Sequence, residues 1–138
     1  MQARKKPETL RLRAVMPTLT VGDMSTSIAW YRDVLGFIVV NEMTHEDKLV
    51  GAVIKAGNAE FLLGQDDWAK GRDRHKGAGL RLYCTTVQDI DQLAADIVAR
   101  GGTLAYEPTD QPWGARDFGV VDPDGFAISV STAMSADE

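Results

Sequence analysis

The chain has 138 residues, of which 44% are apolar and 25% are charged, as is typical of a single globular domain. Its net charge is −5, and because the first thirteen residues contribute +4, the remaining chain carries −9 and disfavours nucleic acid as a partner. The single cysteine excludes an intrachain disulfide and a cysteine-based zinc framework, and no apolar run is long enough to span a bilayer, so we expect a cytoplasmic protein without a membrane partner.

The chain begins with a basic segment, which is followed by one predicted strand and one predicted helix. Residues 1–13 lack apolar periodicity, and we expect them to form a disordered tail before a domain that starts at residue 14. Residues 15–21 alternate as in a strand, and Asp23 then caps a helix that ends at the C-cap Gly36. The apolar stripe of this helix consists of Met24, Ile28, Tyr31 and Leu35.

Three strands follow this helix and complete a first module, residues 14–64. The last two strands should form a hairpin around Gly57 and Asn58, a pair that favours a tight turn. The three strands are predicted at residues 37–43, 49–55 and 59–64. Residues 65–77 are charged and contain two glycines, which indicates a linker.

A second module, residues 78–131, repeats this order and leaves residues 132–138 as a short tail. Asp89 caps its helix, which ends at the glycine pair 101–102. The segment Asp122–Gly125 reads Asp-Pro-Asp-Gly and is typical of a tight turn, because proline fixes φ and glycine allows a positive φ. The strands of this module are predicted at residues 80–87, 103–107, 116–121 and 126–131.

The two modules share the spacing of their marker residues, which indicates an internal duplication. Asp23 and Asp89 are 66 residues apart, as are Gly36 and Gly102, and the glycines of the two hairpin turns are 68 apart. Each module has the order β-α-β-β-β. We therefore predict an α+β domain in which two tandem βαβββ modules form a curled, partly open, barrel-like sheet of eight strands with the helices outside.

Several segments resemble a known family. Pro17–Asp23, followed by Trp30-Tyr31 and Leu35–Phe37, resembles the opening of the vicinal oxygen chelate superfamily, which includes glyoxalase I, extradiol dioxygenases, fosfomycin resistance proteins and bleomycin resistance proteins. Gln111–Phe118, running into the aspartate-proline turn, is similar to the bleomycin-resistance-like branch. The resemblance covers residues 14–131.

The resemblance implies a divalent metal held by the first and last strands of each module, usually through His, Glu or Gln. The four metal positions, counted from the cap aspartates and the turn glycines, are Met16, Phe61, Leu82 and Ser129. Arg81 replaces Leu82 if the second module slips by one residue, and Glu60 could ligate only if its strand were shifted. The two histidines, His45 and His75, fall in a predicted loop and in the linker. None of these arrangements suits a divalent ion, so we expect no metal and no other cofactor.

Without a metal, the resemblance leaves a cleft for a small molecule. The expected ligand-binding residues are Met16, Phe61, Arg81, Tyr83, Trp113, Arg116 and Ser129. Phe61 and Leu82 could instead fill the core. In the related bleomycin-binding proteins, the tryptophan that matches Trp113 stacks on a flat part of the drug between two subunits; without a ligand it would be an interface or core residue. Trp68, preceded by two aspartates, could contact a cationic planar ligand or cap the fold.

Three hypotheses about function follow. The first is a metal-independent, homodimeric binding protein of the bleomycin-resistance type, which sequesters an aromatic or cationic molecule in a cleft or dimer groove. The second is an enzyme of the superfamily, glyoxalase-, lyase- or dioxygenase-like, with a divergent or absent metal site. The third is an accessory domain without a ligand, in which Phe61 and Leu82 plug the cleft.

Overall fold

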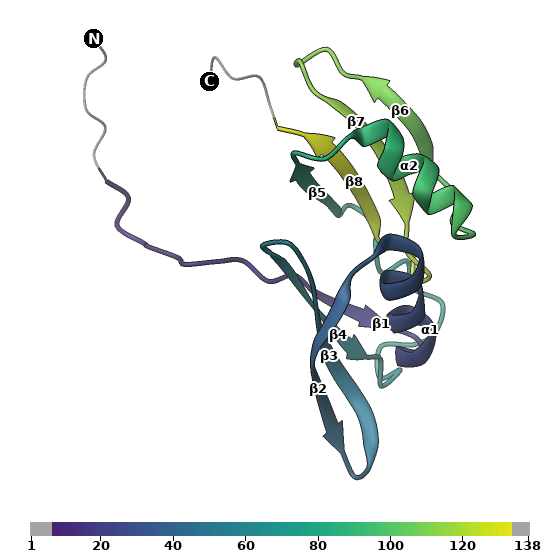
Figure 1. The fold of residues 1–138 in the computed structure, drawn as a ribbon. Coiled ribbons are helices and arrows are strands. Elements are labelled where there is room, and N and C mark those ends of the chain that lie inside the picture. The colour runs from purple at the N-terminus through teal and green to yellow at the C-terminus, as the bar shows by residue number, and fades with distance from the viewer. Residues whose placement is uncertain (1–6, 134–138) are drawn as a thin grey trace.

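The computed structural model describes residues 7–133 and contains two four-stranded sheets, each packed against a helix (Figure 1). The first module contains β1 (Thr18–Val21), α1 (Met24–Ala29), the π-helical segment η1 (Trp30–Leu35), β2 (Ile38–His45), β3 (Lys48–Ala56) and β4 (Ala59–Gln65). The second contains β5 (Arg81–Thr86), α2 (Ile90–Ala99), β6 (Tyr106–Asp110), β7 (Arg116–Val121) and β8 (Ala127–Thr132). The predicted α+β fold of two βαβββ modules is confirmed, with two separate sheets in place of a closed barrel.

The N-terminal tail predicted to be disordered comprises residues 1–13. Of these, residues 1–6 lie outside the described residues, as do residues 134–138 of the C-terminal tail. Residues 7–17 contain no helix or strand and are almost entirely exposed, and they run away from the body of the molecule (Figure 1). No helix within residues 7–133 has the length and apolarity needed to cross a membrane.

The helices begin and end at the capping residues that the sequence predicts. The carboxylates of Asp23 and Asp89 each accept a hydrogen bond from a backbone N–H of the first turn, at 2.9 and 3.0 Å. Gly36 ends the first helical segment with φ of 100°, a conformation that glycine adopts without strain. The predicted single helix is not uniform, because its last turns widen into η1 and the N–H groups of both Gly36 and Phe37 reach the carbonyl of Tyr31.

The first strand of each module pairs in parallel with the last, so the sheet orders are β1-β4-β3-β2 and β5-β8-β7-β6. The hairpin of β3 and β4 turns at Gly57, as predicted. One predicted strand is displaced along the chain, because β6 begins at Tyr106 and not at Thr103. The reason is that Leu104 packs against the core, and the first backbone hydrogen bond to β7 comes from Ala105.

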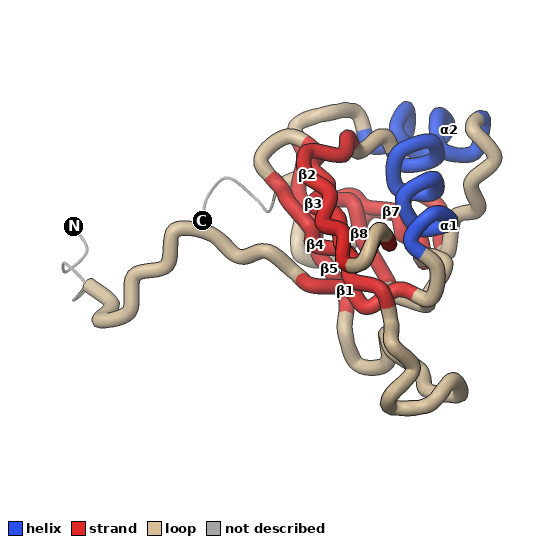
Figure 2. Tube along the Cα trace, turned by 90° about the horizontal axis from the view of Figure 1, so that it is seen from below, coloured by secondary structure: helices blue, strands red, loops and turns tan. Residues whose placement is uncertain are grey.

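Both helices lie on the same side of the strands (Figure 2). The core forms between helices and sheets, and its largest fully buried side chains are Tyr31 and Phe118. We call the opposite face of each sheet, which no helix covers, the open face. Side chains alternate along a strand, so each strand contributes both to the core and to an open face.

The turn at residues 122–125 joins the second module to the first. The hydroxyl of Tyr31 donates to the carboxylate of Asp122 at 2.7 Å, and the N–H of Gly22 donates to Asp124 at 2.8 Å. In the linker, Lys76 pairs with Asp124 at 3.0 Å and with Asp66 at 3.2 Å. The two modules are thus held together by polar groups contributed by α1, η1, the linker and the last hairpin.

Candidate functional site

The open face of the β5-β8-β7-β6 sheet is polar. On its other face, Phe118, Val120 and Ile128 belong to the core and are almost fully buried. The residues that alternate with them occupy the open face. We define there the serine–tyrosine cluster, which consists of Arg81, Tyr83, Tyr106, Ser129 and Ser131.

Ser129 is the centre of this cluster. Its hydroxyl oxygen accepts a hydrogen bond from Arg81 Nη1 at 2.9 Å and lies 2.9 Å from the hydroxyl of Tyr106. Ser129 is only 2% exposed, so water competes little for these bonds. Its cross-strand partner is Gly119, and the ring of Tyr106 lies where a Cβ at Gly119 would be. The absence of a side chain at Gly119 therefore allows Tyr106 to reach Ser129, which in turn orients Arg81.

Tyr83 and Ser131 form a second pair, with their oxygens 2.8 Å apart. The hydroxyl of Ser131 donates its one proton to the carbonyl of Thr132 at 2.8 Å. Tyr83 must therefore be the donor to Ser131. This leaves a lone pair on the oxygen of Tyr83, a partly exposed residue, free to accept a hydrogen bond from a ligand.

A buried carboxylate lies close to the cluster. Asp117 is 2% exposed, pairs across the strands with Ser131, and accepts a hydrogen bond from Gln111 Nε2 at 2.8 Å. Burial raises the pKa of Tyr106 above its usual value, and the negative charge of Asp117 acts in the same direction, whereas the hydrogen bond with Ser129 acts against it. Tyr106 consequently keeps its proton at neutral pH and remains a hydrogen-bond donor.

A hollow of about 270 Å³ is lined by residues of both modules. We call it the inter-sheet hollow. Its walls consist of Val15, Pro17, Ala59, Glu60 and Phe61 from the first module and Arg81, Leu82, Tyr83 and Cys84 from the second. Burial raises the pKa of the Cys84 thiol, so this residue is protonated at neutral pH and fits the predicted role of a small core residue.

Of the seven predicted ligand-binding residues, the structure brings Arg81, Tyr83 and Ser129 together in the serine–tyrosine cluster. Met16 is 44% exposed and lies between two residues that line the inter-sheet hollow. Leu82 packs against the core, so the second module has the slipped register in which Arg81 takes the place of Leu82. That possibility was one of the two that the sequence left open.

Phe61, for which the sequence leaves both the cleft floor and the core open, packs in the core and also lines the inter-sheet hollow. Phe61 is 3% exposed and packs in the core, with its ring centroid 6.1 Å from that of Tyr31 and 5.2 Å from that of Phe37. The cause is turn length, because the loop between β3 and β4 spans residues 57–58 and the loop between β7 and β8 spans residues 122–126. The loops differ by an odd number of residues, which turns equivalent positions to opposite faces. Glu60 therefore takes the open-face place in β4.

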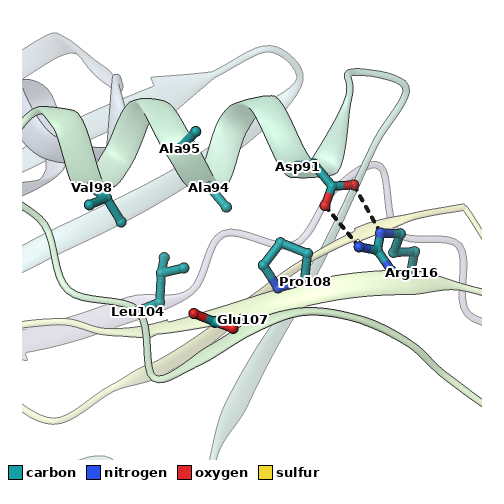
Figure 3. Close-up of a pocket in the computed structure, with 8 residues that line it drawn as sticks. All are labelled: Asp91, Ala94, Ala95, Val98, Leu104, Glu107, Pro108 and Arg116. Carbon is teal, nitrogen blue, oxygen red and sulfur yellow. Dashed lines mark hydrogen bonds and ion pairs between the residues drawn. The ribbon is translucent and has the colours of Figure 1, made fainter.

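Arg116 lies apart from the other predicted residues, in an outer groove of about 520 Å³ between α2 and β6 (Figure 3). Its guanidinium contacts Asp91 at 2.8 Å and Asp110 at 3.1 Å. Hydrogen bonds to Asp91 and Asp110 raise the pKa of Arg116, and the hydrogen bond from Arg116 lowers the pKa of Asp91. The charge of Arg116 is thus already matched by two carboxylates, and it does not face the serine–tyrosine cluster.

The two tryptophans that the sequence singles out have different surroundings. Trp113 is 52% exposed, in the turn between β6 and β7. Trp68 packs over Gly22, and Arg72 lies 4.3 Å from its ring centroid. The adjacent Asp66 is buried, and hydrogen bonds from the backbone N–H of Trp68 and from two linker cations lower its pKa. Trp68 and Asp66 therefore cap the first module and stabilise the linker, which was the second of the two roles considered for Trp68.

The residues at the metal positions do not fit a divalent cation. In the second module, the positive guanidinium of Arg81 donates directly to Ser129, so a cation bound there would meet a like charge and a weak hydroxyl ligand. In the first module, Phe61 is in the core, and only the carboxylate of Glu60 is available on the open face. Among residues 7–133, no three His, Cys, Asp or Glu side chains are grouped as metal ligands would be.

The prediction from sequence missed three residues of the site, namely Tyr106, Asp117 and Glu60. One signal was present for Asp117, since Asp117-Phe118-Gly119-Val120 and Ile128-Ser129-Val130-Ser131 alternate polar or small residues with apolar ones. This pattern predicts a polar open face. Nothing local indicates that Tyr106 would cover Gly119, because that contact depends on where β6 begins.

Comparisons with known proteins agree with this architecture. Residues 12–130 match the family model described as the glyoxalase/bleomycin resistance protein/dioxygenase superfamily. The chain is 31% identical over 126 residues to a bleomycin resistance protein of Geobacillus stearothermophilus, covering 83% of this chain and 92% of the relative. A protein of unknown function from Agrobacterium tumefaciens has a similar structure, with a TM-score of 0.70, 26% identity, and coverage of 91% of this chain and 97% of that chain. TnmS3, an antibiotic binding protein from Streptomyces, has the same fold, with a TM-score of 0.67, 22% identity, and coverage of 91% and 100%.

Proposed function

Because the chain belongs to the glyoxalase/bleomycin resistance protein/dioxygenase superfamily, we propose that it binds a small organic molecule in the inter-sheet hollow and over the serine–tyrosine cluster, without a metal. The observation that carries this proposal is the bond from Arg81 to the buried Ser129, which Tyr106 supports. Polar groups fixed in this way before binding lose little conformational entropy when a ligand arrives.

The ligand that we expect is aromatic or cationic. The exposed ring of Trp113 offers a stacking surface, and stacking adds about 0.5 to 1.5 kcal/mol to the free energy gained by burial. The acidic body of the chain favours positively charged molecules. The curated relative is named a bleomycin resistance protein, which supports sequestration of a drug-like molecule in the cytoplasm as the function.

We also expect a homodimer. Leu10, Leu12 and Val15 on the N-terminal segment and Trp113 are exposed, and apolar groups of this size commonly pack against a partner. Light scattering on the full chain would measure the mass directly. A monomer at micromolar concentration would contradict this part of the proposal.

Isothermal titration calorimetry with bleomycin and with ethidium, a flat aromatic cation, tests the binding function. We expect saturable binding of at least one probe by the wild-type protein and weaker binding by Trp113→Ala. Val87→Ala, which removes another exposed apolar side chain, serves as the control and should bind as the wild type does. Absence of heat from both probes, or identical affinities for the wild type and Trp113→Ala, would contradict the proposal.

A further inference from the structure

The inter-sheet hollow contains two opposite charges that come from different modules. Glu60 on β4 and Arg81 on β5 both line it. Within residues 7–133, no ion pair involves either of them. This sets Arg81 apart from Arg116 and Lys76, each of which contacts two carboxylates. The hollow thus presents a guanidinium and a carboxylate that do not neutralise each other by contact.

Arg81 is prepared to bind an anionic group. A guanidinium has five N–H donors in a planar fork, and the bond to Ser129 uses only one of them. That bond also fixes the direction of the side chain, since Ser129 is buried and in contact with Tyr106. The remaining donors match the two oxygens of a carboxylate, which arginine binds with two parallel hydrogen bonds.

The other polar groups of the hollow are acceptors. The carboxylate of Glu60 can only accept hydrogen bonds when it is ionised. The hydroxyl of Tyr83 donates its hydrogen bond to Ser131, so its oxygen is also available as an acceptor. An ammonium group has three donors and no acceptor, and it therefore complements Glu60 and Tyr83.

We infer that the inter-sheet hollow binds an amphoteric small molecule, which carries an amino group and a carboxylate on one ring system. The carboxylate contacts Arg81, the amino group contacts Glu60 and Tyr83, and the ring packs against Pro17 and Leu82. A ligand with both charges brings an opposite charge to each of these two exposed side chains. A volume of about 270 Å³ accommodates a single ring system. This inference rests on the proposed binding function and assigns the ligand class of the same site.

Three indole probes that share one ring separate the two charges. Tryptophan carries both groups, tryptamine carries only the amine, and indole-3-propionate carries only the carboxylate. In calorimetric titrations of the full chain we expect tryptophan to bind about tenfold or more tightly than either single-charge probe, because a hydrogen bond to a charged group is worth a factor of this order.

Substitutions then assign each charge to its residue. Arg81→Gln should reduce the affinity for tryptophan to that for tryptamine and leave tryptamine binding unchanged. Arg81→Lys keeps the positive charge but loses the planar fork of N–H donors. This variant should therefore retain part of the preference for tryptophan over tryptamine. Glu60→Gln should reduce the affinity for tryptophan to that for indole-3-propionate. The matched controls are Arg32→Gln and Glu42→Gln, two exposed residues on η1 and β2, and thermal melts check that every variant is folded.

The outcomes distinguish this inference from the proposed function. The amphoteric ligand class is contradicted if the wild type binds tryptophan no more tightly than tryptamine. It is also contradicted if folded Arg81→Gln still binds tryptophan more tightly than tryptamine by the wild-type factor. Trp113-dependent binding of ethidium would in either case still support the proposed function. If none of the indoles and neither of the earlier probes binds at millimolar concentration, both are wrong.

Discussion

The two modules are alike on the faces that pack against their helices and differ on the faces that they leave open. On the helix side, both have a capped helix against apolar residues from the central strands. On the open side, β4 contributes Glu60 and Leu62, whereas β5 and β8 contribute the serine–tyrosine cluster. The shared core follows from the duplicated fold, whereas the hydrogen-bonded serine–tyrosine cluster belongs to the second copy. Function is placed on a fold and is not implied by it.

The largest effect expected from this comparison concerns Phe61 and Ser129, which occupy equivalent positions after the hairpin turns. Phe61→Ala should lower the free energy of unfolding by about 3 to 5 kcal/mol, because it removes a ring from the aromatic core around Tyr31. Ser129→Ala should cost only about 1 kcal/mol, the value of a hydrogen bond. Urea denaturation measures both. Equal losses would contradict the placement of Phe61 in the core and of Ser129 on the open face.

A second comparison concerns two glycines, Gly119 in the second module and Gly51 in the first. A Cβ at Gly119 would overlap the ring of Tyr106, whereas a Cβ at Gly51 would meet only the terminal methyl of Met43, at 2.7 Å. Gly119→Ala should therefore lower the free energy of unfolding by about 1 to 3 kcal/mol, and Gly51→Ala should cost less, because methionine moves easily. The same denaturation curves give the answer. A larger loss for Gly51→Ala would contradict the proposed role of Tyr106 as the fixed element of the cluster.

The smallest effect concerns Tyr31, whose counterpart in the second helix is Ile97. Tyr31→Phe removes the hydrogen bond to Asp122 and should cost about 1 to 2 kcal/mol at neutral pH. Burial raises the pKa of Asp122, and the bond from Tyr31 acts against this rise. A carboxyl group whose pKa is higher in the folded than in the unfolded state adds to the free energy of unfolding while it is protonated. For Asp122 this contribution is fully present below the pKa of the unfolded state and is lost as the pH rises through the pKa of the folded state.

In Tyr31→Phe the folded pKa of Asp122 rises further, so this loss is greater in the variant. The difference between wild type and variant should accordingly grow as the pH is raised from 3 to 7. Thermal melts across that range measure it, with Ile97→Val as a control that alters the equivalent helix position without a titrating partner. A difference that is constant with pH would mean that the hydroxyl does not stabilise ionised Asp122.

Local chemistry made most of the fold predictable from the sequence. Asp23, Asp89 and Gly36 have the capping roles expected of their side chains and backbone freedom, and both hairpins turn at the predicted residues. These features depend on a few neighbouring residues. The α+β class and the two modules followed from them.

The site was less predictable because it depends on register and on distant contacts. Counting from Gly57 and Gly125 gave the wrong face for Phe61, since turns of different length separate equivalent strands. Arg81 and Leu82 could not be distinguished without knowing which of them faces the helix. The burial of Tyr106 over Gly119 depends on the start of β6, and element boundaries are weakly encoded in a sequence.

The turn at residues 122–125 has a consequence for the whole chain. The N–H of Gly22 and the hydroxyl of Tyr31, both in the first module, find their partners only in this last hairpin. A fragment that ends at the linker would leave these two groups without the aspartates that bind them and would leave Lys76 with Asp66 alone, so we expect that the first module does not fold by itself. Because the polar groups of one module are satisfied by the other, we expect the two halves to unfold in one cooperative step.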